Sequence, residues 1–272
     1  MSTQLVDQLY RPAEYRDAPV VHLFGGPYVT LGARRHEVPQ GSKQLLAFVA
    51  LRRRRVERNH AAGTIWPVGD DTRAAGNLRS ALWRLRRAGI DVLVADKWSL
   101  GLGASVLVDL HLMDQWATRL IEGTALGEDL AISPSWADAL NLLPGWYDDW
   151  ALMERERIRQ RILHALEALS GRLAAAGRFA DAVEAAILAV SAEPLRETAQ
   201  RALISAHVAE GNLAEARRSY RVYRDLVRSE LGVEPSRDLL TMLRIPEARG
   251  PVATLWRPPQ PARLPRQAAP AG

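Results

Sequence analysis

The spacing of apolar residues changes once along the chain, near residue 108, and this change predicts two differently built regions. Before it, short alternating segments are separated by glycine and proline, which is typical of strands and tight turns. After it, to about residue 245, the spacing is helical almost throughout, with breaks at single Gly and Pro residues. A chain of 272 residues is long enough for two such domains.

The charge divides at the same place. Residues 19–107 contain 14 Lys and Arg against 6 Asp and Glu, whereas residues 108–249 contain 17 against 22. A basic module followed by an acidic one indicates nucleic acid as the partner at one end and a different partner at the other.

The composition narrows the cellular setting. The chain has no cysteine, which excludes disulfides and thiolate metal sites and fits a reducing compartment. No stretch approaches the roughly 18 consecutive apolar residues of a membrane span. The N-terminal arm, residues 1–18, is acidic and lacks an apolar signal core. We therefore expect a cytoplasmic, nucleoid-associated protein without membrane contact.

The first region begins with short strands and continues into helices. Apolar residues alternate over 20–38, which predicts strands. Ser42 is expected to cap a helix over 43–53, and Asn59 to cap a second helix over 59–66. Both helices are short enough to pack around one small core.

A third helix and a hairpin complete this region. Asp71 or Thr72 is positioned to cap the helix, and Gly89 fits its end at the C′ position. Residues 92–100 then read as a β-hairpin with its turn at Asp96-Lys97. Strands, three helices and a C-terminal hairpin predict an α+β winged helix-turn-helix over 19–107.

The third helix has one apolar and one basic side. At 100° per residue, a core stripe is formed by Leu78, Ala81, Leu82 and Leu85. The opposite side carries Arg73, Asn77, Ser80, Arg84 and Arg87. Gly76 lies on that side, where a glycine allows close approach of a backbone. No acid occurs between Thr72 and Ile90, whereas a merely solvated helix usually mixes both signs.

These residue types suit DNA. Arg pairs bidentately with guanine, Asn with adenine, and Arg on a helix flank with phosphates. Lys43, in the first turn of a helix, and Lys97, at the hairpin turn, are further candidates. The predicted DNA-binding residues are Lys43, Arg73, Asn77, Arg79, Ser80, Trp83, Arg84, Arg87 and Lys97. The alternative is a solvated amphipathic helix. The Arg52–Arg55 run is expected to end its helix and face solvent.

The second region repeats itself. Residues 176–182, AGRFADA, recur as residues 210–216, EGNLAEA, at an offset of 34 residues. This offset is the tetratricopeptide period, with a glycine turn between paired helices. We therefore predict an all-α, tetratricopeptide-like domain over 108–246, with chance similarity as the alternative. The tail, 247–272, contains six prolines without periodicity and is expected to be disordered.

Taken in order, these segments resemble the Streptomyces antibiotic regulatory proteins, activators with an OmpR-like winged helix and a bacterial transcriptional activator domain. In the first region the matching stretches are GSKQLLA (41–47), IWP (65–67) and AAGNLRSALWRLRR (74–87). In the second they are VDL (108–110), LPGWYDDW (143–150), ERER (154–157), PLRE (194–197) and ELGVEP (230–235). Together they span about residues 20–245.

The resemblance implies an activator that binds direct repeats in promoter DNA near the −35 element and recruits RNA polymerase holoenzyme through its sigma factor. It implies control of antibiotic biosynthesis genes by a homodimer or by tandem protomers on DNA. The loop expected to face polymerase comprises Trp66, Pro67, Val68, Gly69, Asp70 and Asp71. The chain lacks the Gly-x-x-x-x-Gly-Lys motif of the ATPase module found in larger relatives, so we expect a small stand-alone member.

Other chemistry finds little support in the sequence. The six histidines have no metal-ligand spacing, so neither a metal nor a cofactor is expected. Asp148 and Asp149 are expected to begin a helix rather than to form a catalytic pair. Trp136, Trp146 and Trp150 are expected to pack between helices rather than to line a ligand pocket. We therefore expect no enzyme.

Two rival functions remain open at this stage. A winged-helix repressor or architectural protein would share the DNA contacts but needs no surface for polymerase. A tetratricopeptide scaffold would instead use the basic domain to bind a protein or RNA.

Overall fold

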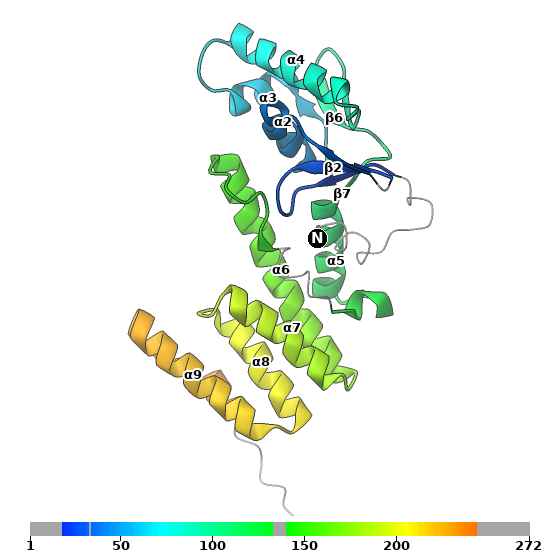
Figure 1. Ribbon diagram of the computed structural model, residues 1–272. Helices are drawn as coiled ribbons and strands as arrows, with labels where there is room; N and C mark the ends of the chain where they lie inside the picture. The colour runs from blue at the N-terminus through cyan, green and yellow to red at the C-terminus, as the bar shows by residue number, and fades with distance from the viewer. Residues whose placement is uncertain (1–17, 33, 133–139, 244–272) are drawn as a thin grey trace, which may run out of the picture.

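The computed structural model describes residues 18–32, 34–132 and 140–243, which form a small α+β region followed by an elongated helical one (Figure 1). The predicted tail, Trp136 and all but the last residue of the predicted N-terminal arm lie outside the described residues. No helix in the described part of the chain is long and apolar enough to cross a membrane.

The first sheet is built from the N-terminal strands and one later strand. It contains β1 (Val20–His22), β2 (Tyr28–Leu31), β3 (Arg34–Glu37) and β7 (Leu107–Val108), in the order β3-β2-β1-β7. Antiparallel pairing joins β1 to β2 and β2 to β3, and parallel pairing joins β1 to β7. The parallel pair brings the end of the first region back beside its beginning.

Three helices and a second sheet follow the pattern of a winged helix-turn-helix. The helices are α2 (Gln40–Ala50), α3 (Arg58–Ile65) and α4 (Asp71–Arg87). The second sheet contains β4 (Val56–Glu57), β5 (Leu93–Ala95) and β6 (Ser99–Leu102), in the order β4-β6-β5. The predicted strands, three helices and hairpin are confirmed. The two-residue strand β4 was not predicted, because so short a segment has no periodicity of its own.

Three predicted helix caps are wrong. Ser42 lies inside α2, which runs over 40–50 rather than 43–53, and its buried hydroxyl donates to the Ala81 carbonyl oxygen at 2.9 Å. The cap position of α3 is Glu57, not Asn59. Asp70, rather than Asp71 or Thr72, caps α4 by accepting the Arg73 N–H at 2.7 Å. In each case the helix begins at or before the residue that was predicted to cap it.

The second region is helical, as predicted. Its α-helices are α5 (Asp109–Glu122), α6 (Asp149–Ala175), α7 (Phe179–Ala192), α8 (Glu197–Glu210), α9 (Leu213–Leu231) and α10 (Arg237–Met242), and η2 (Gly127–Leu130) is a 3₁₀ turn. Asp148 occupies the cap position of α6, so the acidic pair begins a helix as expected. Helices α6 to α9 pack each against the next (Figure 1).

The 34-residue repeat corresponds to two equivalent turns. Gly177, between α6 and α7, and Gly211, between α8 and α9, both have positive φ, 75° and 84°. Each turn is closed by the same backbone hydrogen bond at 2.9 Å, from Arg178 N–H to Leu173 and from Asn212 N–H to His207. These bonds satisfy carbonyls that a helix end leaves free. The predicted helical repeat is therefore confirmed.

The two regions share one hydrophobic core. A single cluster of buried residues runs from β1 and α2 through α5 and α6 to α8, and it includes Phe24, Phe48, Trp116 and Leu163. Trp150 joins it edge-on to Phe48, with the ring centroids 5.2 Å apart. The predicted domain boundary falls inside β7, next to the helix that shares this core. The boundary itself stays a prediction.

Asp109 fixes α5 to the first sheet. Its fully buried carboxylate accepts hydrogen bonds from the backbone N–H groups of Leu23, Phe24 and Leu110, at 2.7 to 3.1 Å. Burial raises its pKa to about 7, against the lowering effect of these N–H donors. Asp109 thus joins the two regions chiefly through backbone groups, with the Nδ1 atom of His22 also 3.8 Å from its carboxylate.

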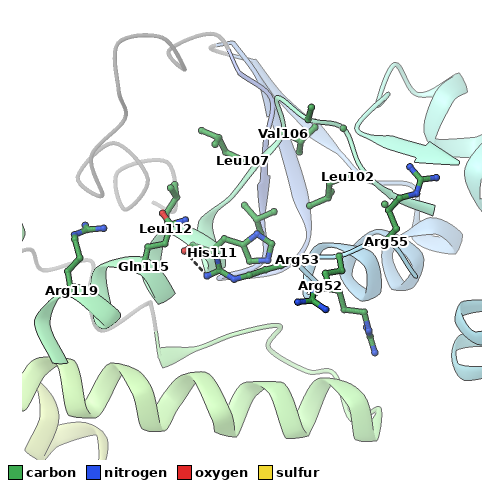
Figure 2. A pocket seen from close by; sticks show the side chains of 15 residues that line it. Arg52, Arg53, Arg55, Leu102, Val106, Leu107, His111, Leu112, Gln115 and Arg119 are labelled. Atoms are coloured by element: carbon green, nitrogen blue, oxygen red, sulfur yellow. Dashed lines mark hydrogen bonds between the residues drawn. The ribbon is translucent and has the colours of Figure 1, made fainter. Parts of the chain in front are cut away.

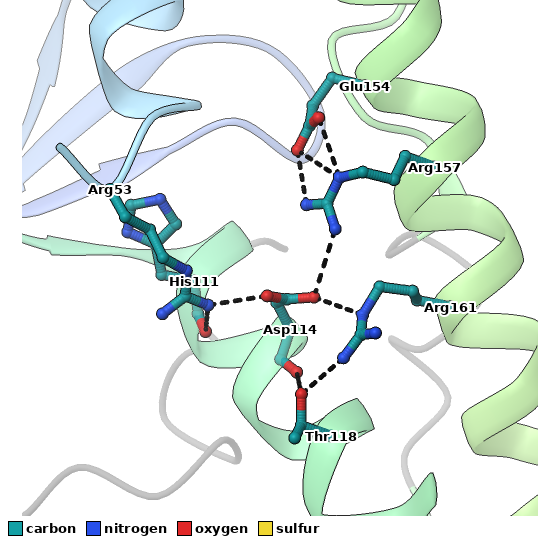
Figure 3. A network of polar contacts seen from close by, with 7 residues as sticks. All are labelled: Arg53, His111, Asp114, Thr118, Glu154, Arg157 and Arg161. Atoms are coloured by element: carbon teal, nitrogen blue, oxygen red, sulfur yellow. Dashed lines mark hydrogen bonds and ion pairs between the residues drawn. The ribbon is translucent and has the colours of Figure 1, made fainter. Parts of the chain in front are cut away.

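Asp114, one turn further along α5, makes a second junction (Figure 3). One of its carboxylate oxygens lies 2.8 Å from Arg53, which follows α2. The other lies 2.6 Å from Arg161 and 3.8 Å from Arg157, both on α6. One carboxylate therefore connects the winged-helix region with the long helix of the second region.

Candidate nucleic-acid interface

Helix α4 is anchored on its apolar side. Ala74 and the four predicted core residues, Leu78, Ala81, Leu82 and Leu85, are buried against α2 and α3, which confirms the predicted stripe. Gly89, with φ 74°, follows the C-cap Ala88 as predicted. The anchoring fixes which side of the helix faces outward.

The outward side of α4 is basic and aromatic. Arg73, Ser80 and Arg87 are exposed, and Trp83 is 57% exposed. The Arg87 guanidinium lies 5.1 Å from the centre of the Trp83 ring, within the range of a cation–π contact. A Cβ built at Gly76 would have only the Arg79 guanidinium within 4 Å, so another backbone can approach this position. Arg79 is exposed on the flank.

Two residues of the predicted set lie at the edge of this side and are half-buried. Asn77 is one of them. The other is Arg84, whose guanidinium donates to the Gly41 carbonyl oxygen at 2.9 Å. A Cβ at position 41 would lie 2.8 Å from the Arg84 Nη2 atom, so a larger residue there would displace this guanidinium. Arg84 therefore braces α4 against the start of α2, a role that its sequence position alone did not show.

Lys43 lies in the first turn of α2 and is half-buried. Because α2 begins at Gln40, Lys43 is its fourth residue. Gly41 and Ser42, its neighbours in that turn, both contact α4. Lys43 therefore belongs to the turn of α2 that packs against α4.

The turn of the β5–β6 hairpin forms the wing and is held by Asp96. Its carboxylate accepts the backbone N–H groups of Trp98 and Ser99, both at 2.7 Å, and the Arg55 guanidinium, also at 2.7 Å. The N–H of Ser99 contributes most to lowering the pKa of Asp96. Arg58 donates to the Asp96 carbonyl oxygen at 3.2 Å. The wing is thus an ordered turn rather than a loose tip.

Sequence reasoning missed Trp98 as a candidate contact. Its side chain is 70% exposed beside Lys97, whose Nζ atom lies 4.8 Å from the centre of the Trp98 ring. Its place beside Lys97 in the predicted hairpin turn was the available signal. A tight turn exposes its side chains, and a tryptophan left exposed there is typical of a binding surface rather than of core packing.

The loop between α3 and α4 presents a different surface. Val68 is 82% exposed, and Gly69 has φ 112°, a conformation that favours glycine. Asp70 is occupied as the α4 cap, and Trp66 is half-buried at the end of α3. The apolar, uncharged tip of this loop differs from the basic side of α4.

The Arg52–Arg55 run is exposed from Arg53 to Arg55, as expected, but Arg52 is half-buried and two of the exposed arginines have acidic partners. The guanidinium of Arg52 is half-buried over the Phe48 ring, 3.5 Å from its centre, and burial lowers its pKa. Arg53 contacts Asp114, and Arg55 contacts Asp96. Packing around the end of α2 therefore uses three of these four arginines.

Residues 131–244 match the family model described as the bacterial transcriptional activator domain. No curated protein matches the chain. A solved structure of Mycobacterium tuberculosis EmbR, in complex with a low affinity phosphopeptide, has a similar fold, with a TM-score of 0.63 and 18% sequence identity. The similarity covers 83% of this chain and 64% of the EmbR chain, so this chain spans less than two thirds of EmbR.

The family match supports the resemblance to the Streptomyces antibiotic regulatory proteins over residues 131–244, and the solved structure shows that the chain shares the EmbR fold. Its architecture is a winged helix-turn-helix followed by a helical region that contains the match to the bacterial transcriptional activator domain.

Proposed function

We propose that the protein is a sequence-specific transcription activator that inserts α4 into the major groove of promoter DNA. The outward side of α4 carries this proposal, because it combines exposed Arg73, Ser80, Trp83 and Arg87 with an open position at Gly76 and no acid. Exposed guanidiniums without internal carboxylates favour phosphates and guanine edges as partners.

Within this interface the structure supports different roles for different side chains. Arg73, Ser80, Trp83 and Arg87 face outward and are proposed to contact base edges. Arg79 on the flank and Lys43 in the first turn of α2 are proposed to contact phosphates. Lys97, with Trp98, is proposed to contact the backbone or the minor groove from the wing. Asn77 and Arg84, half-buried at the edge, are proposed to contact DNA only along one margin of α4.

The resemblance supports the finer part of the proposal. Tandem protomers or a homodimer would bind direct repeats near the −35 element of promoters for antibiotic biosynthesis genes. Half-sites about one helical turn apart would place both protomers on one side of the DNA. The α3–α4 loop, with exposed Val68, would contact RNA polymerase through its sigma factor, and the activator domain would supply further polymerase or protomer contacts.

Footprinting tests the DNA-binding part. The protein is titrated against promoter fragments from the neighbourhood of its gene at two salt concentrations. We expect protected direct repeats and an affinity that falls steeply with salt, because phosphate contacts release counterions. If no fragment shows a protected site, the proposal fails and a scaffold that binds protein or RNA takes its place.

Transcription in vitro separates an activator from a repressor or an architectural protein. Purified polymerase holoenzyme transcribes a promoter that the protein has been shown to protect. We expect more transcript with the protein than without it, and less stimulation by Val68→Asp at unchanged DNA affinity. An unchanged or lower transcript yield from the protected promoter contradicts activation.

Arg84→Ala refines the assignment of the edge residue. If Arg84 contacts a base, affinity falls by about 1 to 3 kcal/mol and the preference at one base pair relaxes. A uniform loss across operator variants would assign it to a phosphate or to bracing α4. Arg84→Lys keeps the charge but not the bidentate geometry. It should therefore keep most of the affinity if Arg84 contacts a phosphate, and lose it if Arg84 contacts a base.

A further inference from the structure

A cavity of about 730 Å³ lies where the winged-helix region meets α5 (Figure 2). Its wall is formed by the Arg52–Arg55 run, by β6 and the residues that follow it, by β7, and by one side of α5. The volume falls within the range of about 300 to 1,000 Å³ typical of small-molecule sites. The cavity lies away from α4, although β6, one of its walls, belongs to the wing hairpin.

The lining is apolar on one part and cationic on another. Leu102, Val106, Leu107 and Leu112 are half-buried and line the cavity together. Five arginines also line it, Arg52 to Arg55 and Arg119, and no Asp or Glu is among its lining residues. A lining of this kind fits an organic anion with an apolar body.

Not all of this positive charge is neutralised within the protein. Carboxylates outside the lining pair with three of the arginines: Asp114 with Arg53, Asp96 with Arg55, and Asp129 with Arg119. In the described part of the chain, no carboxylate lies within ion-pair distance of Arg52 or Arg54. Arg54 is exposed at the cavity wall, so it is the guanidinium most available to an external anion.

His111 adds a polar group to the cavity wall. Burial, together with the charge of Arg53, lowers its pKa to about 4, so the ring is neutral near pH 7. The Nε2 atom of this ring is buried and has no hydrogen-bond partner among the described residues. A ligand with a hydroxyl or amide group could satisfy it.

DNA bound to α4 would leave this cavity free. The start of α2 contacts α4 through Gly41 and Ser42, whereas the cavity lies beyond the other end of α2. The 11 residues of α2 separate these ends by about 16 Å, at 1.5 Å per residue. A phosphate of the same DNA is therefore a poorer candidate for the cavity than a separate small molecule.

The cavity wall is continuous with the wing. A Cβ at Gly101, in β6, would lie 3.1 Å from the Cγ atom of Arg55, so the Arg55 stem lies across this strand. The same side chain holds Asp96 and Ser99 in the wing turn. A molecule that displaces Arg55 would change the support of the wing.

We propose that this cavity binds a small organic anion with an apolar body, and that its occupancy changes the affinity for DNA through Arg55 and the wing. The binding stands independently of the proposed function, whereas the effect on DNA rests on it. By reciprocity, DNA would change the affinity for the anion by the same factor.

Binding is tested on the full chain with 8-anilinonaphthalene-1-sulfonate, a fluorescent aromatic anion, and with N-phenyl-1-naphthylamine, its uncharged counterpart. We expect saturable binding of the anion at one site and at least about tenfold weaker binding of the uncharged dye, because charge-assisted contacts are the stronger ones. Absence of saturable binding, or equal affinity for both dyes, overturns the proposal.

Variants at exposed positions locate the site. Arg54→Gln removes the available charge, and Gln115→Glu places a carboxylate at the cavity wall. Each is expected to weaken binding of the anionic dye by about five- to tenfold, with an unchanged melting temperature. Arg221→Gln on α9, also exposed, removes the same charge away from the cavity and should change nothing. Unchanged affinity in both cavity variants overturns the site.

The effect on DNA is tested on a protected promoter fragment. A saturating concentration of the anionic dye should change the dissociation constant of the wild-type protein for this fragment at least threefold. The change should shrink in Gln115→Glu at the same dye concentration. The same shift in both proteins, or none, overturns the coupling. A chain that protects no fragment even without dye contradicts the proposed function instead, and leaves the dye-binding result standing.

Discussion

Two arginine-rich helices in this molecule differ in what surrounds their guanidiniums. In the first turns of α6, Arg155 donates to backbone carbonyls, and Arg157, Arg159 and Arg161 all lie within ion-pair distance of carboxylates. On α4, Arg73, Arg79 and Arg87 have no carboxylate at that distance among the described residues, and Arg86, on the same helix, has only Asp91 at 4.0 Å. The same residue type is thus internally neutralised on one helix and left for an external anion on the other.

The comparison separates structural arginines from candidate binding ones more sharply than charge counting does. Isolated surface ion pairs contribute only about 0 to 1 kcal/mol, so the pairs on α6 matter chiefly because they remove charge that could attract DNA.

Arg73→Ala combined with Arg87→Ala should nearly abolish specific DNA binding. Each contact is worth about 1 to 3 kcal/mol, so affinity for a protected promoter fragment should fall at least about thirtyfold. Electrophoretic mobility shift titration measures the loss. The matched control is Arg217→Ala with Arg221→Ala, which removes two exposed arginines from α9. Equal losses in both double variants would mean that only net charge matters, and the comparison would fail.

Asp109→Ala tests a buried carboxylate whose partners all belong to the protein itself. Three backbone N–H groups lose their acceptor in the core, so the free energy of unfolding should fall by about 2 to 4 kcal/mol. Chemical denaturation measures it. Asp109→Asn keeps one oxygen as an acceptor and should lose about half as much. A loss below about 0.5 kcal/mol in the alanine variant would mean that water replaces the carboxylate.

Asp109 should also make stability depend on pH. Its pKa is raised from 3.8 to about 7, so the folded state holds the proton more tightly than the unfolded state. The resulting stabilisation is fully present below about pH 4 and is lost as the pH rises through about 7. The melting temperature of the wild type should therefore fall across this window more than that of Asp109→Asn. Parallel curves for the two proteins would contradict the raised pKa.

Asp114→Asn weakens the contact of one carboxylate with three arginines. Because these arginines are partly exposed, we expect a loss of only about 1 to 2 kcal/mol in the free energy of unfolding. DNA affinity measured well below the melting temperature should stay within about twofold. A large loss of affinity at full folding would show that this junction also sets the position of α4.

Asp96→Ala should have the smallest effect on the fold. It removes the acceptor that holds the exposed wing turn, so the wing loses order while the core is untouched. Affinity for a protected fragment should fall about threefold, with an unchanged melting temperature. Asp91→Ala, at another exposed acid of the same region, serves as the control. An equal change in both variants would mean that the wing makes no contact.

Local patterns predicted much of the fold. The leucine stripe of α4, the strands over 20–37, the β5–β6 hairpin and the repeated glycine turns each depend on residues close in sequence, so their spacing is visible there. The predicted outward side of α4 also follows from this spacing, although its contact with DNA stays a prediction.

Contacts between distant residues could not be predicted in the same way. Ser42 looked like a cap because serine commonly is one, but its hydroxyl reaches Ala81. Arg84 looked free, but it lies against Gly41, 43 residues away. The Arg52–Arg55 run became the wall of a cavity only when α5 packed beside it. Periodicity contains no information about which faces meet.

The parallel pairing of β1 with β7 bears on the order in which the chain folds. Residues 20–24 are made early, yet their partners come much later: Leu23 N–H bonds to Asp109, 86 residues on, and the Leu23 carbonyl accepts the N–H of Leu143. Closing such long loops is slow, and a nascent chain emerges from its N-terminus. The first sheet therefore cannot be completed until β7 and Asp109, the first residue of α5, have been synthesised, so the winged helix should reach its final form only together with the start of the activator domain.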